Sequence, residues 1–184
     1  MKKLSIESDR LVMRSLDAAD TEQFFDFLIR NTEFFRKWSP EYEPNYFSVW
    51  YHKAWLEIIE KEFTEGRQIK FGAYLKDNMN TIIGTVSFSN IIKGVFLSCY
   101  LGYRFDEKHI NKGYATEAIS RGVAYVFETL GLHRVEANIM PSNFASIRTI
   151  EKCGFENEGL SRKYLKIDGI WEDHYHFVKL NEKA

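Results

Sequence analysis

Residues His109–Ala118 read HINKGYATEA, and this stretch separates two segments of different pattern. Before it, Val95–Phe105 is a nearly continuous apolar run, which is typical of a strand in the interior of a sheet. After it, Gly113–Gly131 places its apolar residues on one helical face, and His133–Met140 follows as a further strand. A strand, a helix and a strand in this order predict a right-handed crossover between two parallel strands.

The start of that helix is suited to binding an anion. Its first backbone N–H groups have no partner within the helix, and the helix dipole adds positive potential there. Gly113 lets the backbone approach a ligand closely, Ala115 adds little bulk and Lys112 adds positive charge. The nucleotide motifs GxxxxGK[ST] and GxGxxG do not occur at this turn. Taken alone, the turn fits either a phosphate site or an ordinary helix start.

The rest of the chain predicts one α/β domain with a mixed sheet. Two strand patterns around Asp168-Gly169 indicate a closing hairpin. The aromatic side chains of Trp50, Tyr51 and Trp55 are expected in the core. Other expected strands cover residues 4–16 (with a turn), 68–76 and 81–91, and other expected helices cover residues 17–30, 45–63 and 143–155.

Composition excludes several classes of protein. The 184 residues are 45% hydrophobic with a formal net charge of −1, whereas general nucleic-acid or anionic-membrane binding needs a basic excess. The N-terminal segment has no apolar signal-peptide core and no run reaches transmembrane length, so we expect a soluble cytoplasmic protein. Cys99 and Cys153 lack metal or redox spacing and are expected to be buried, reduced thiols.

Several motifs together resemble the GNAT acetyltransferase superfamily, and within it the ribosomal-protein N-terminal acetyltransferase group. They are LGYRF at 101–105, NKGYATEA at 111–118 and NFASIRTIEKCGF at 143–155. Residues 8–20 (SDRLVMRSLDAAD) are similar to the opening of that group, and residues 168–180 (DGIWEDHYHFVKL) to its closing hairpin. The resemblance spans nearly the whole chain. It implies one N-acetyltransferase domain over residues 1–184, a mixed, mostly antiparallel sheet flanked by helices, and acetyl-CoA as co-substrate.

The resemblance also implies how the cofactor binds. Ile110 stands where the family usually has Gln or Arg, and Asn111 where Gly is frequent, although Asn tolerates left-handed backbone. The strand end that precedes the turn would pair with the pantetheine arm, and one of its amides would polarise the thioester carbonyl. The implied contacts are the backbone near Tyr103, Arg104 and Phe105 for the arm, and the amides of Lys112, Gly113, Tyr114, Ala115 and Thr116 for the pyrophosphate.

Three further residues are implied in binding or catalysis. The resemblance gives Asn143 a contact with the pantetheine arm and Ser146 a hydroxyl that protonates the departing thiolate, although both also suit ordinary helix caps. Relatives often carry Glu where this chain has Tyr100, whose hydroxyl would then relay the proton of the amine. Glu117 and Glu136 lie nearby in sequence, but surface and helix-terminal charge explain them equally well.

The lack of a clear carboxylate base helps to predict which kind of amine accepts the acetyl group. An α-amine has a pKa near ~7.8 and a lysine near ~10.4, so the α-amine needs far less help to become neutral. We therefore expect acetylation of a protein N-terminus, such as that of a ribosomal protein. The alternatives are a small amine (an antibiotic, polyamine or amino acid) or a non-catalytic acyl-CoA sensor. We expect no nucleic acid or membrane partner, and a monomer or homodimer.

The loop at residues 38–46 is the candidate acceptor groove. The aromatic residues Trp38, Tyr42 and Tyr46 would line it, and Glu41 and Glu43 either attract a basic peptide or are simply solvated. A metal site is not expected. His174 and His176 alternate on one strand face, but no third ligand has fitting spacing.

Overall fold

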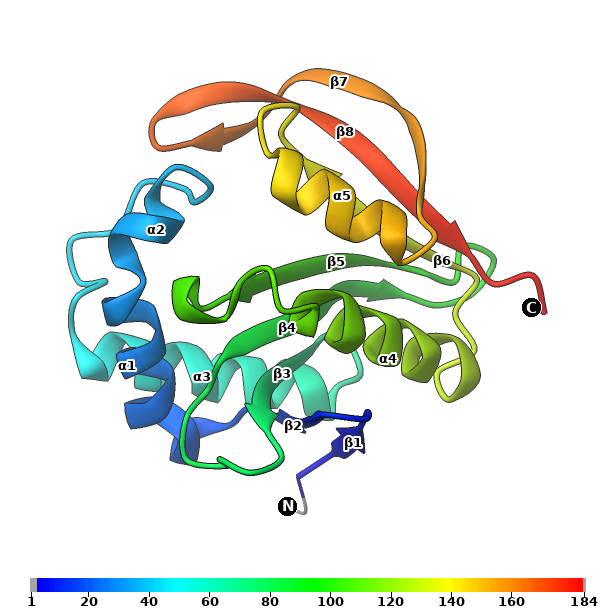
Figure 1. The fold of residues 1–184 in the computed structure, drawn as a ribbon. Coiled ribbons are helices and arrows are strands. Elements are labelled where there is room, and N and C mark those ends of the chain that lie inside the picture. Colours follow the sequence, from blue (N-terminus) through cyan, green and yellow to red (C-terminus); the bar gives the residue numbers. More distant parts are fainter. Residues whose placement is uncertain (1–2, 184) are drawn as a thin grey trace.

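The computed structural model describes residues 3–183 and shows one eight-stranded sheet flanked by helices (Figure 1). The strand order is β1-β2-β3-β4-β5-β6-β8-β7. The strands are β1 (Ser5–Glu7), β2 (Leu11–Ser15), β3 (Ile69–Leu75), β4 (Gly84–Ile92), β5 (Ser98–Phe105), β6 (Arg134–Ile139), β7 (Glu156–Ile167) and β8 (Ile170–Leu180). The helices are α1 (Thr21–Arg30), α2 (Thr32–Arg36), α3 (Val49–Thr64), α4 (Tyr114–Glu128) and α5 (Phe144–Lys152), with 3-10 turns η1 (Ala18–Asp20) and η2 (Glu107–His109).

The predicted parallel pairing of the two strands is confirmed, and the sheet opens between them. β5 and β6 pair in parallel, whereas the other neighbouring strands pair antiparallel. Their pairing covers only Ser98–Tyr100 against Arg134–Glu136. Beyond Tyr100 the two strands part, so each leaves backbone groups facing the gap between them.

The two faces of the sheet have separate hydrophobic cores. One core packs α4 and α5 on the sheet through residues such as Ile119, Val126 and Ile150. The other packs α1 and α3 on the opposite face through residues such as Phe27 and Leu56. The gap between β5 and β6 is therefore approached from two sides, each with its own helices (Figure 1).

The second predicted helix differs from the structure. It begins at Val49 rather than at residue 45, and its buried side chains are His52, Leu56 and Ile59. Trp50 is 61% exposed, so its expected place in the core was wrong. The reason is that the i, i+4, i+7 row from His52 faces the sheet, and Trp50 lies on another side of the helix.

One other boundary and one short helix also differ from the prediction. The predicted strand at Val95–Phe105 begins only at Ser98, and Val95 is fully exposed. Gly94 (φ 78°) and Leu97 (φ 43°) hold left-handed backbone there, which ends regular pairing. The short helix α2 was not predicted.

The closing hairpin and the cysteines agree with the predictions. Asp168 (φ 44°) and Gly169 (φ 80°) form its two-residue turn, and the Asp168 amide donates to the Ser39 carbonyl at 2.9 Å. The hairpin tip is thus attached to the loop that follows α2. Cys99 and Cys153 are buried free thiols. Within residues 3–183, none of the helices has the length and apolar character to cross a membrane.

Candidate active site

Two cavities meet at the outer end of β5. The larger, of about 910 Å³, lies between the diverging ends of β5 and β6 and reaches the start of α4 and the first turns of α5. The smaller, of about 450 Å³, lies on the opposite sheet face below α1 and α3. Both are lined by Ser39, Gly102, Tyr103 and Arg104. Two molecules bound in these cavities would therefore meet across one short segment of strand.

Most of the predicted site residues lie together in the larger cavity. Two do not line it, namely Lys112 and Tyr100. Arg148 and Lys152 of α5, which the sequence did not single out, add positive charge to its wall. The predicted residues that line it are Tyr103, Arg104, Phe105, Gly113, Tyr114, Ala115, Thr116, Asn143 and Ser146.

The turn before α4 has the geometry of an anion site. Gly113 is the N-cap with φ 80°, and Asn111 has φ 59°, so the left-handed backbone expected of this Asn is present. The amide of Glu117 makes the first helical hydrogen bond, to the Gly113 carbonyl at 3.0 Å. The amides before it are left without a helical acceptor, and those of Tyr114, Ala115 and Thr116 belong to residues that line the cavity.

Arg10, in the turn between β1 and β2, supports this anion turn. Its guanidinium donates to Glu117 at 2.7 Å and to the Lys112 carbonyl at 3.0 Å, and it lies 4.5 Å from the Tyr114 ring centroid. Burial acts to raise the pKa of Glu117, but the hydrogen bonds from Arg10 and Ser8 outweigh it and lower that pKa. Glu117 is therefore a charged anchor for Arg10 and is not available as a base. Sequence patterns could not pair residues 107 positions apart.

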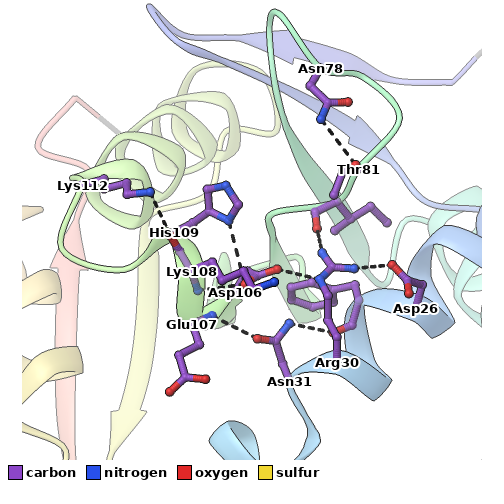
Figure 2. A network of polar contacts seen from close by, with 12 residues as sticks. Asp26, Arg30, Asn31, Asn78, Thr81, Asp106, Glu107, Lys108, His109 and Lys112 are labelled. Atoms are coloured by element: carbon purple, nitrogen blue, oxygen red, sulfur yellow. Dashed lines mark hydrogen bonds and ion pairs between the residues drawn. The ribbon is translucent and has the colours of Figure 1, made fainter.

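A second network holds the segment that leads into the turn (Figure 2). Arg30 of α1 donates to Asp106 at 2.7 Å and to Asp26 at 2.5 Å. Burial acts to raise the pKa of Asp106, but hydrogen bonds from Arg30 and the Lys108 amide outweigh burial and lower that pKa. The Lys112 ammonium donates to the Lys108 carbonyl at 2.8 Å, so it braces the segment and does not line the cavity.

The first turn of α5 brings Ser146 against the end of β5. The Asn143 amide oxygen accepts from the Ser146 amide at 3.2 Å, which is the ordinary cap interaction. The Tyr103 hydroxyl donates to the Ser146 carbonyl at 3.2 Å, and burial raises the pKa of Tyr103 to about 12. This contact fixes the half-buried Ser146 beside the shared segment of β5.

Tyr100 lies beside Glu136 across the last paired rung of β5 and β6, outside both cavities. Glu136 accepts from His176 at 2.8 Å and from Arg134 at 3.1 Å, so its carboxylate is already engaged. His174 contacts the Glu172 carbonyl at 3.0 Å. In the part of the chain that the structure describes, no group of three or more His, Cys, Asp or Glu side chains is arranged to hold a metal.

The smaller cavity contains most of the predicted acceptor groove. Tyr42, Tyr46, Glu41 and Glu43 line it, as expected, whereas Trp38 lines the larger cavity. The lining residues that the sequence reasoning missed include the polar residues His52, Lys70, Thr85 and Ser87.

His52 has a defined role in that wall. Its Nε2 lies 2.6 Å from the Tyr46 carbonyl, an acceptor, so this nitrogen carries the hydrogen. Burial lowers the pKa of His52, which keeps the ring neutral. The signal in the sequence that could have found His52 is a polar residue in the row of α3 that otherwise holds apolar, sheet-facing residues.

Comparison with known proteins identifies the family. Residues 10–156 match the family model described as "Acetyltransferase (GNAT) domain". The chain belongs to the GNAT acetyltransferase family. A GNAT relative, the [ribosomal protein uS5]-alanine N-acetyltransferase of Escherichia coli (strain K12), is 36% identical over 174 residues, which are 94% of this chain and 88% of that protein.

Solved GNAT structures have the same fold. The ribosomal-protein-S5-alanine acetyltransferase from Vibrio fischeri superposes with a TM-score of 0.92 at 29% identity, covering 97% of each chain. Mycobacterium smegmatis RimJ, solved in complex with CoA-disulfide, superposes with a TM-score of 0.88 at 25% identity, covering 95% of this chain and 83% of that one. The predicted GNAT fold and family are confirmed, and the predicted acetyl-CoA-dependent N-acetyltransferase activity is that of the family.

Proposed function

We propose that this GNAT protein transfers an acetyl group from acetyl-CoA to the α-amine of a protein N-terminus, by direct attack in a ternary complex. The observation that carries the proposal is the meeting of the two cavities at Gly102–Arg104, with an anion turn at one end of the larger cavity. We take the whole of residues 1–184 as one such domain.

The larger cavity fits acetyl-CoA in size and in donor groups. The residues at the start of α4 line it, and a side chain at Gly113 would place its Cβ 3.3 Å from an Arg10 nitrogen. The amides at the start of α4 would hold the pyrophosphate, and the diverging backbone of β5 would pair with the pantetheine arm. When bound, acetyl-CoA supplies an activated thioester.

The residues of this chain then act around that thioester. An amide near Tyr103–Phe105 would donate to the thioester carbonyl as negative charge develops on its oxygen. The Asn143 side-chain oxygen already caps α5, and its remaining hydrogen-bonding groups would contact the pantetheine arm. The Ser146 hydroxyl would donate a proton to the departing thiolate. Tyr100 lies outside both cavities, so any contribution to proton relay must pass through another group.

The charges around the site favour an α-amine acceptor. Glu117 and Glu136 are the carboxylates that the sequence places near the site. Glu117 is engaged by Arg10 and Glu136 by His176, so neither is a free base. The smaller cavity instead contains Lys70, whose pKa is lowered to about 7 by burial and by the nearby Arg104 charge. An amine bound there is pushed towards its neutral form in the same way, and an α-amine, with a pKa near ~7.8, needs only a small part of such a shift.

Thiol release from acetyl-CoA across a panel of peptides and small amines tests the proposal. We expect turnover with peptides that have a free α-amine, and loss of that turnover when the terminus is blocked. Faster turnover with spermidine, an aminoglycoside or free lysine would assign a small-molecule acceptor. Acetyl-CoA binding without turnover on any amine would assign a sensor.

A further inference from the structure

The smaller cavity contains two cations that have no acidic partner. Lys70 of β3 and Arg104 of β5 both line it, and both are half-buried. Among residues 3–183, no carboxylate oxygen lies within 4.0 Å of either side chain. Cations that are partly removed from water and have no acidic partner are uncommon, because desolvation of a charge is costly.

Aromatic rings surround the two cations in place of carboxylates. The Lys70 ammonium lies 4.9 Å from the Trp55 ring centroid and 5.8 Å from that of Phe24. The Arg104 guanidinium lies 5.5 Å from the Phe35 ring centroid. The Tyr46 hydroxyl is buried in the same cavity beside the Arg104 guanidinium, which acts to lower the pKa of Tyr46 while burial raises it more. The wall therefore offers two cations, one of them beside a tyrosine hydroxyl, to whatever enters.

The sheet register places this pair close to the proposed reaction centre. Lys70 lies directly across from Ser87, and Ser87 directly across from Gly102, so the three share one face of three adjacent strands. Two strand spacings amount to roughly 10 Å, of which the extended lysine side chain can cover more than half. The Ser87 hydroxyl lies between Lys70 and Gly102 and donates to the Gly102 carbonyl at 3.2 Å, and Gly102 adds no side chain of its own, so only the small Ser87 side chain separates Lys70 from this part of β5.

The mouth of the cavity has the opposite charge. Glu41 and Glu43 line it from the loop after α2, and both are exposed. A substrate with several positive charges would meet acids only at the rim and cations at the floor. The floor therefore disfavours polyamines and favours an acceptor with a negative group within a few bonds of its amine.

We propose that Lys70 and Arg104 form an anion-recognition pair that selects protein N-termini carrying Asp or Glu as their first or second residue. With the α-amine at Gly102–Arg104, such a carboxylate reaches towards the two cations, and the following residues leave past Glu41 and Glu43. The proposal rests on the proposed α-amine acetylation, because it names the N-termini that this reaction would use. Burial and the nearby Arg104 charge lower the pKa of Lys70 to about 7, and a carboxylate bound beside it would raise that pKa and favour the charged lysine.

Steady-state kinetics on matched peptides test the proposal. Peptides that differ only by Asp against Asn, or Glu against Gln, at the first or second residue should differ by about 10- to 100-fold in kcat/KM, mostly through KM. In Lys70→Met the ratio of kcat/KM for acid peptides to that for amide peptides should fall at least about tenfold, and Lys70→Arg should retain much of that ratio. Lys53→Met, at an exposed position of α3 outside both cavities, is the matched control and should behave as wild type.

The possible failures can be told apart. Equal kcat/KM for acid and amide peptides in the wild-type protein would overturn the anion pair and leave N-terminal acetylation standing. An acid preference that survives in a folded Lys70→Met protein would overturn the role of Lys70. Absence of turnover on every peptide, with acetyl-CoA still binding, would overturn the proposed function and this inference together. The comparison of acid and amide peptides on the wild-type protein tests the proposal even if a variant fails to fold.

Discussion

Replacing Gly113 by Ala tests whether the turn before α4 holds the cofactor phosphates. Gly113 has φ 80°, a conformation that costs an L-residue with a side chain about 1–2 kcal/mol. The added Cβ would also lie 3.3 Å from the Arg10 guanidinium, which is a tight contact. The variant relieves both by leaving the left-handed conformation, and binding then requires the strained turn to be restored.

That strain sets the size of the expected effect. If 1–2 kcal/mol must be recovered on binding, the Kd for acetyl-CoA rises about 5- to 30-fold. Isothermal titration of the variant and of the wild type measures the difference directly. Any part of the strain that the unliganded variant keeps lowers its melting temperature instead, by about 2–4 °C for each kcal/mol.

Gly131 provides the matched control. It also has positive φ (65°), but it follows α4, and a Cβ added there meets nothing within 4 Å. Gly131→Ala should lose similar stability and keep the wild-type Kd. A folded Gly113→Ala protein with wild-type affinity would refute the assignment of the phosphates to this turn.

Three further predictions follow from the site. Arg10→Met should weaken acetyl-CoA binding by loosening the turn before α4. Arg121→Met, which removes a hydrogen bond to the Glu7 carbonyl away from the cavity, should leave binding unchanged. Equal Kd values for Arg10→Met and the wild type in a titration would contradict the role of Arg10. Ser146→Ala should lower kcat about a hundredfold with an unchanged cofactor Kd, and a variant with reduced stability and wild-type kcat would leave Ser146 only a structural role. Lys70→Met should be more stable than wild type below pH 7, and this difference in stability should shrink as pH rises from about 7 to 10.5. The reason is that in this window the unfolded wild-type chain binds more protons than the folded one, so the wild type gains stability as pH rises. A stability difference that stays constant in chemical denaturation across pH would contradict this.

The crossover and its turn were predictable because their signals are local. The apolar run before Phe105, the glycine at 113 and the helical face after it are each read from adjacent residues. The closing hairpin was predictable for the same reason, since Asp168-Gly169 favours one turn type. Cofactor residues on these elements were therefore found from the sequence.

The acceptor cavity was less predictable because its residues meet only in the folded sheet. Lys70, Arg104 and Trp55 come from three separate elements, and no spacing links them. Arg10 reaches the anion turn from a turn close to the N-terminus, about a hundred residues earlier in the sequence. The exposed Trp50 shows a related limit, because a run of aromatic residues does not state which side of a helix faces the sheet.

The most direct test of the central proposal is to locate the transferred acetyl group. The protein is incubated with isotope-labelled acetyl-CoA and a peptide that has both a free α-amine and an internal lysine, and fragment mass spectrometry assigns the label. We predict label on the α-amine, dependent on an intact Ser146, with the lysine side chain unmodified. Label on the lysine side chain, or none on the peptide while a small amine in the same mixture is acetylated, would contradict the proposal.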